Sequence, residues 1–554
     1  MTDSTDWYAQ THHATKRLVA IRSVSPSSDE NDVAREVLRL LHEDGGAERL
    51  TGSGLEPVPH DPHGRLVAWA FLQGESSRTV VLSGHIDTVG MADYGALEPW
   101  ALQPDALMER IGRLQAIATG LQADMQAAPD DWMVGRGVLD MKSGVAATIT
   151  VMRHLAGLER APLSVVLVAT PDEENESAGM LAAVGLLTRL RDQYGLEYVG
   201  AINADITTSR YPGDPDRTIY EGTIGKLLPG IFVAGLPAHA GDPLAGVDAA
   251  LLVAELVHDL DLNFDLCDTV ETEHGTLRTP PPVVLLARDL KHHYDTQIPF
   301  AAWILLNVLT YRTGPEHLLE RLRTICEVAL ERTLRHVRAA QRRHNTHASD
   351  SDLTDWQATV LVYDELRTDV VALLGPEVVE QELQSMWEQI PADRDKRERS
   401  VSLVQRLWAL SGRQGPALVL FLAPPVYPHV GPAAGDLQQA VAATVAAHSE
   451  LRLRLEPYYP YLSDMSYLRL ESGVEPAVLE RTMPVWRDTP AALGGYSLPL
   501  QEIRSLNIPV VNIGPYGHAV HQAGERALMS YSFRQVPQLI VEVIERLGRL
   551  GPVQ

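Results

Sequence analysis

Apolar residues in the first part of the chain alternate between short continuous runs and helical repeats. Buried strands are predicted by the continuous runs at residues 66–72, 79–82, 164–169 and 198–203. Helices are predicted by apolar positions three and four residues apart at residues 31–42, 145–158 and 180–194, and around Leu18, Ile21 and Val24. Alternating strands and helices predict an α/β fold with a mixed sheet and helices on both faces.

A second pattern begins after Glu221 and predicts an inserted α+β domain. Its strands are expected at residues 226–234, 283–287, 301–309 and 359–362, and its helices at 247–260, 316–343 and most of 369–410. A β-like run at residues 417–422 suggests a return to the first domain, which closes with a strand at 510–513 and a helix at 536–550. We therefore expect a main domain at residues 1–221 and 415–554. A second domain at residues 222–414 interrupts it and is enlarged by helices at residues 366–412.

Residues 92–131 interrupt the main domain with a helical pattern of their own. Their apolar residues recur at helical spacing, at Leu107, Ile111, Leu114, Ile117 and Leu121. A helical insertion is expected there.

Net charge and composition exclude some classes of partner and of metal ligand. The net charge of −25 repels nucleic acid and anionic membrane surfaces, so neither is expected as a partner. With only 2 cysteines in 554 residues, any metal must be held by histidine and carboxylate groups. The first residues carry no apolar signal core and no uncharged run could span a bilayer, so a cytoplasmic protein is expected.

Candidate metal ligands follow the predicted strands. The segment VVLSGHIDTVG delivers His85 and Asp87, and GRGVLDMKSG carries Asp140 among glycines. Each segment also has an ordinary interpretation: His85 could simply end a strand with Asp87 in the loop after it, and Asp140 could cap a helix. The glycine spacing around Asp140 does not match a phosphate-binding loop, because Lys142 and Ser143 precede Gly144.

Further carboxylates and histidines extend this set. TPDEENESAG places Glu173 and Glu174 after a buried strand, where clustered acids repel one another unless a cation neutralises them. Asp205 ends a further strand and, taken alone, would be a turn residue. His518 and His521 lie near the C-terminus. Histidine and carboxylate ligands without cysteine suit Zn²⁺, with Mn²⁺ or Co²⁺ as substitutes. One catalytic zinc needs about three protein ligands, so a set of two histidines and at least three carboxylates suggests two ions that share a carboxylate.

With these segments in order, the sequence resembles the aminoacylase/carboxypeptidase-G family of dinuclear zinc peptidases and deacylases. GHIDTV, GRGVLDMKSG and the DEE triplet carry the resemblance together. It implies that His85 and Asp205 bind one zinc, Glu174 and His521 the other, and that Asp140 bridges them. His521 is preferred because the family's last ligand lies four residues before a glutamate, here Glu525, and His518 is the alternative.

The resemblance also implies catalytic roles. Glu173 would be the general base that activates a water bridging the two zincs, and Asp87 would orient His85. The inserted domain would be a lid in which GLPAHAGDPLAGVDAA supplies His239 to stabilise the oxyanion, and Arg312 would bind a substrate carboxylate. In this family the lid often makes the contact between two subunits of a homodimer, but a lid this long can also mimic the partner subunit, so both arrangements stay open.

The implied activity is hydrolysis of an amide bond in an N-acyl amino acid or a small peptide. The chain length, the segment SDMSY and the large lid also resemble the arginine-utilisation protein subgroup. The alternatives are a dipeptidase or exopeptidase of the same family, and a non-catalytic zinc-binding paralogue.

Overall fold

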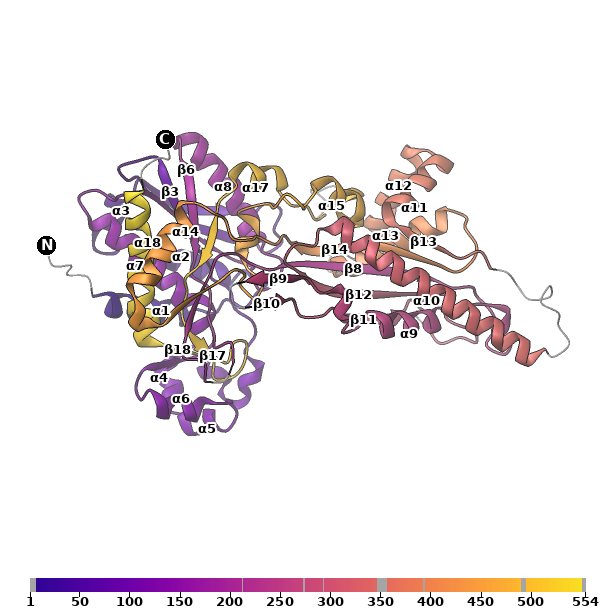
Figure 1. Cartoon of the computed structure of the whole chain (residues 1–554), viewed down its shortest axis with the longest axis horizontal. Coiled ribbons are helices and arrows are strands. Elements are labelled where there is room, and N and C mark those ends of the chain that lie inside the picture. Colours follow the sequence, from indigo (N-terminus) through magenta and orange to yellow (C-terminus); the bar gives the residue numbers. More distant parts are fainter. Residues whose placement is uncertain are drawn as a thin grey trace. The chain divides into compact units, whose positions relative to one another are not determined.

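The computed structural model describes residues 6–211, 213–272, 275–291, 293–345, 356–391, 394–489 and 495–550. The chain divides into two compact units. The first unit comprises Met1–Ile224, Val430–Leu470 and Pro499–Gln554, and the second comprises Gly225–His429 and Glu471–Leu498. Figure 1 shows that the start of the chain, in indigo, and its end, in yellow, belong to the same unit.

An eight-stranded mixed sheet forms the centre of the first unit. In spatial order its strands are β1 (Gly52–Pro57), β2 (Leu66–Leu72), β5 (Ser164–Thr170), β3 (Arg78–His85), β6 (Glu197–Asn203), β16 (Val510–Asn512), β7 (Arg217–Tyr220) and β15 (Leu453–Glu456). The neighbours β5, β3 and β6 run parallel, with His85 opposite Thr170 and Ser83 opposite Asn203. Their carboxyl ends therefore share one edge of the sheet, where open α/β sheets bind ligands.

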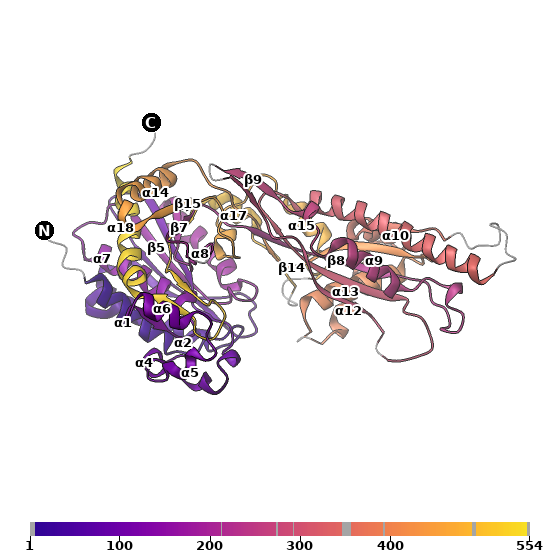
Figure 2. The ribbon, with the colours of Figure 1, turned by 60° about the horizontal axis from the view of Figure 1, so that its bottom comes forward.

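Helices cover both faces of this sheet. They are α1 (Trp7–Val19), α2 (Glu30–His42), α3 (Gly46–Arg49), α7 (Ser143–Gly157), α8 (Ala178–Tyr194), α14 (Asp436–Ala447), α17 (Leu500–Leu506) and α18 (Val536–Arg549). In Figure 2, α7, α14 and α18 lie on one side of the strands, and α8 and α17 on the other. The helix expected around Leu18 begins earlier and ends at Val19, because Val24 instead bridges to Thr88 beside the sheet. The predicted α/β fold class is confirmed.

The expected helical insertion consists of the short helices η2 (Ala92–Trp100), α4 (Pro104–Met108), α5 (Ile111–Gln115) and α6 (Leu121–Ala127). They bury a hydrophobic cluster of their own, which includes Tyr94, Leu97, Leu107, Leu114 and Leu121. Beside them lies a small three-stranded sheet of β17 (Gly517–His518), β18 (Arg526–Leu528) and β4 (Trp132–Val134).

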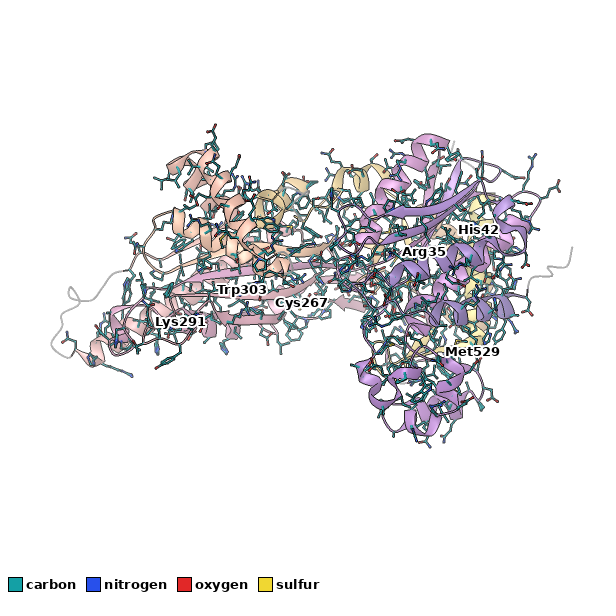
Figure 3. All side chains as sticks on the ribbon, turned by 180° about the vertical axis from the view of Figure 1, so that it is seen from behind. Arg35, His42, Cys267, Lys291, Trp303 and Met529 are labelled. Atoms are coloured by element: carbon teal, nitrogen blue, oxygen red, sulfur yellow. The ribbon has the colours of Figure 1, made fainter. Side chains whose placement is uncertain are left out.

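The second unit is built on a five-stranded sheet. Its order is β11 (Val283–Asp289), β12 (Ala301–Thr310), β8 (Gly225–Ala234), β14 (Ala417–Tyr427) and β13 (Thr359–Val362), with a separate hairpin of β9 (Thr269–Thr272) and β10 (Gly275–Arg278). Its helices are α9 (Ala249–Leu260), α10 (Pro315–His344), α11 (Tyr363–Leu374), α12 (Pro376–Gln389), α13 (Lys396–Leu410), α15 (Pro476–Thr482) and α16 (Pro484–Arg487). Trp303 on β12, labelled in Figure 3, is almost fully buried in this unit.

The structure differs from the expected boundary at residue 415. The apolar strand β14 pairs antiparallel with β8, so residues 417–427 belong to the sheet of the second unit. The segment Glu471–Leu498, with α15 and α16, also belongs to the second unit, although it was expected in the main domain. Sequence pattern alone shows that β14 is a buried strand, but not with which sheet it pairs. Within the described residues, no helix is long and apolar enough to cross a membrane.

Candidate metal centre

Two histidines face the same aspartate at the carboxyl edge of the large sheet. His85 ends β3 and is buried, and its Nε2 lies 3.0 Å from Oδ1 of Asp140. The other carboxylate oxygen of Asp140, Oδ2, lies 3.1 Å from Nε2 of His521. Asp140 therefore presents one oxygen to each histidine.

Each histidine has a further carboxylate near it. Asp205, after β6, has its Oδ1 4.0 Å from Nε2 of His85. Glu174 has its Oε1 3.0 Å from Nε2 of His521. The donor atoms thus form two groups that share Asp140: His85 with Asp205, and Glu174 with His521.

Asp87 fixes the loop that carries the glutamates. Its Oδ1 accepts the backbone N–H of Glu173 at 3.1 Å and its Oδ2 accepts that of Glu174 at 3.0 Å. The Nδ1 of His85 lies 3.2 Å from the backbone oxygen of Asp87 and 3.5 Å from its carboxylate. Asp87 thus contacts His85 and also holds the loop between β5 and α8.

Three further polar side chains hold the site, and their supporting role was not predicted from the sequence. Glu525 accepts the backbone N–H groups of Leu139 and Asp140 at 3.0 and 3.1 Å. Asn512 accepts the N–H of Asp205 and donates to its carbonyl oxygen, both at 2.9 Å. Asp464 accepts from the Thr170 hydroxyl at 2.7 Å.

Only weak signals in the sequence could have identified these three. Glu525 stands four residues after His521, and Asp464 lies in the SDMSY segment. Asn512 lies in a predicted strand without any motif. Their contacts depend on segments that are far apart in the chain.

Burial of several acids in one place shifts their pKa values. Burial raises the pKa of Asp205 to about 7, and that of Glu173 and Glu174 above their usual range, and neighbouring carboxylates add to each shift. The carboxylates of Asp140 and Glu174 raise the pKa of His521 to about 10. Burial opposes ionisation of Asp140, but its contacts with His521 and His85 outweigh burial and lower its pKa.

This donor set fits two divalent cations. Two ligands of one zinc ion, each bound at about 2.0–2.2 Å, lie within about 4.4 Å of each other. The distances of 3.0 and 4.0 Å around His85 and of 3.0 and 3.1 Å around His521 meet this limit. Cations would also offset the mutual repulsion that raises the pKa values of the buried acids.

Three other candidate residues are not members of these two groups of donor atoms. The Nδ1 of His518 is 2.8 Å from Asp124, on the helical insertion, while His521 contacts Glu174 and Asp140. His239 and Arg312 lie in the second unit, and both are exposed.

The fold and the clustered donors define a metallohydrolase with two adjoining metal positions. The comparison with known proteins identifies its family: residues 81–484 match the profile of peptidase family M20/M25/M40, and the chain belongs to this family. Two relatives from Bacillus subtilis (strain 168) match along most of the chain. "Uncharacterized protein YqjN" is 32% identical over 483 residues (85% of this chain, 84% of the relative), and "Protein RocB" is 31% identical over 507 residues (89% and 86%). The resemblance stated from the sequence is thereby confirmed.

Solved structures share the fold at low sequence identity. The dipeptidase Dug1p from Saccharomyces cerevisiae has a TM-score of 0.52 at 11% identity, covering 98% of this chain and 96% of its own. The YxeP protein of Bacillus subtilis, described as a dinuclear metal binding peptidase of the M20 family, has a TM-score of 0.50 at 11% identity, covering 97% of each chain.

Proposed function

We propose that the chain hydrolyses an amide bond of an N-acyl amino acid or a short peptide, with two zinc ions in the site. His85 and Asp205 hold one ion, Glu174 and His521 hold the other, and Asp140 binds both. The observation that carries this proposal is the position of Asp140, whose two carboxylate oxygens lie 3.0 and 3.1 Å from two different histidines.

Two bound cations supply Lewis acidity, which lowers the pKa of a water molecule and polarises the scissile carbonyl. Glu173 then acts as the general base, taking the proton of the attacking water and passing it to the leaving nitrogen. Its carboxylate Oε2 lies 3.9 Å from Nε2 of His85, beside the proposed ligands. Asp87 supports this role, because it holds the backbone N–H of Glu173.

His239 is suited to stabilise an oxyanion. Its Nδ1 accepts the backbone N–H of Gly241 at 2.9 Å. A neutral imidazole that accepts at Nδ1 carries its proton on Nε2, which can donate to the oxygen of the tetrahedral intermediate.

Arg312 is suited to bind a substrate carboxylate. Asp268 accepts the backbone N–H groups of Tyr311, Arg312 and Thr313, each at 2.8 Å, and so fixes the turn that presents this side chain. A guanidinium group can bind a carboxylate through two parallel hydrogen bonds.

A substrate panel tests the proposal. Purified full-length chain is loaded with Zn²⁺, Mn²⁺ or Co²⁺ and assayed on N-acyl amino acids and on dipeptides, and light scattering on the same samples gives the number of chains per particle. Release of free amino acids from either class of substrate supports hydrolysis of an amide bond. Cleavage of dipeptides alone would narrow the activity to the dipeptidase alternative. A chain that binds the ions but cleaves neither class would be a non-catalytic zinc-binding paralogue.

A further inference from the structure

His521 lies in the tip of a short hairpin. The stems are β17 and β18, in which His518 pairs with Arg526. The backbone of the tip has positive φ at Ala519 (61°), His521 (58°) and Gly524 (83°). Residues other than glycine keep such angles only where the surroundings hold them.

Asp124, on α6 of the helical insertion, binds both stems of this hairpin. Its Oδ2 is 2.8 Å from Nδ1 of His518 and accepts from Nε of Arg526 at 2.6 Å. Arg526 is only 2% exposed, so Asp124 compensates a buried charge. The His518 ring also stacks on Trp132, whose indole N–H donates to the backbone oxygen of Asp124 at 2.9 Å.

The insertion also packs against the tip itself. A Cβ atom added to Gly524 would lie 2.3 Å from the Cβ of Ala118. Ala523 belongs to the hydrophobic cluster of the insertion, and Nη2 of Arg526 donates to the backbone oxygen of Thr119 at 3.3 Å. Figure 1 shows β17 and β18 next to α4 and α6.

We propose that the insertion at residues 92–131 clamps the hairpin that carries His521, and that Asp124 is a positioning residue for the metal ion at Glu174 and His521. This inference rests on the proposed function, because it requires an ion at that position. The other ion depends less on the clamp, because His85 ends β3 and Asp205 follows β6, and neither residue lies in the hairpin.

Loss of the Asp124 carboxylate would release both stems at once. The buried Arg526 guanidinium would then have to move towards solvent or towards another acceptor, and the tip would shift with it. A change in the groups that hold a metal ligand typically lowers metal affinity by about 10–100-fold. The affinity for the ion at Glu174 and His521 should therefore fall more than the affinity for the other ion.

Metal titration of Asp124→Ala tests this inference. Zn²⁺ and Co²⁺ are titrated into the metal-free full-length chain in competition with a chelator, and the two dissociation constants are compared with those of the wild type. We expect one constant to stay within about twofold and the other to rise by about 10–100-fold. His521→Ala should lose the same ion. Adding Asp124→Ala to His521→Ala should then cause no further loss of affinity at the ion that remains.

Asp105→Asn is the matched control, because Asp105 lies on the same insertion but forms an exposed ion pair with Lys16. It should leave both constants unchanged. If Asp124→Ala does not fold, Gly524→Ala tests the same clamp from the hairpin side. Unchanged constants, or equal weakening of both ions, in whichever variant folds would overturn the inference. A wild-type chain that binds no ion would instead contradict the proposed function, and with it this inference.

Discussion

The carboxylates around the metal centre differ in what holds them. Asp140 faces two histidines, whereas Asp87 uses both oxygens on backbone N–H groups of the glutamate loop. Glu525 joins the backbone of Asp140 to the buried Arg136, whose Nη1 donates to it at 2.7 Å. Asp87 and Glu525 thus accept from backbone N–H groups and a guanidinium, which cannot bind a cation, whereas the partners of Asp140 are imidazole nitrogens, which can.

Glu173→Gln tests the assigned base. The amide has nearly the shape of the carboxylate but cannot take a proton from water, so turnover should fall by roughly two orders of magnitude or more. The content of metal ions, measured by elemental analysis, should stay at the wild-type value. Glu176→Gln, in the same loop, is the control and should keep turnover. Full activity in Glu173→Gln would show that the base is another group.

The chemistry of single residues was readable from the sequence where a motif and a strand end coincided. His85, Asp140, Glu174 and Asp205 were singled out on these grounds. His521 was chosen from its spacing to Glu525 in the family resemblance. The structure brings the donor atoms of all five together in two groups. Glu525 could not be given its role, because the N–H that it holds belongs to Asp140, 385 positions earlier. Pairings of this kind arise only from the folded chain.

At the scale of elements, α7, the helix that follows Asp140, packs closely against the chain just after β6, the strand that precedes Asp205. Gly144 lies in the first turn of α7, and a Cβ there would come within 1.8 Å of the backbone oxygen of Ala204. Only a residue without a side chain allows this approach, which sets the separation of the two aspartates.

Gly144→Ala should therefore destabilise the chain. The backbone of Ala204 would have to move, at a cost of about 1–3 kcal/mol or more in the free energy of unfolding. Gly157→Ala, at the other end of α7, is the matched control, because the nearest atom to its added Cβ is 3.8 Å away. Urea unfolding measures both variants. Equal stability of the two would contradict the packing argument.

Long elements were predicted well because their apolar periodicity is local. The strand expected at 66–72 is β2 and the helix expected at 316–343 is α10, with ends within one residue. The strands β4, β7, β15, β17 and β18 were missed, because each spans four residues or fewer and depends on distant partners. The long strand β14 was recognised but assigned to the wrong sheet, because its partner β8 lies far away in the chain.

At the scale of the whole molecule, the stability of the metal-free chain should depend on pH. Asp205 has its pKa raised to about 7 and His521 to about 10, so the folded state binds more protons than the unfolded state over the pH range from about 4 to 10. Stability without metal should therefore fall as pH rises through this range.

Bound cations should restore part of the stability that the metal-free chain loses as pH rises. Ions replace protons on the same ligands, so the difference in melting temperature between zinc-loaded and chelator-treated chain should widen from pH 5 to pH 8. At a free ion concentration of about 100 times the dissociation constant, one site adds about 2.7 kcal/mol. Differential scanning calorimetry measures both samples. A difference that narrows with pH would contradict the proposed ligands.

The ion count of wild-type chain and of Asp140→Ala tests the shared aspartate most directly. After zinc loading and removal of free ion, elemental analysis should find two zinc ions per wild-type chain and fewer than one in the variant, because both ions of the proposed site share Asp140. One ion per wild-type chain, or two ions retained by Asp140→Ala, would contradict a site in which this carboxylate joins two metals.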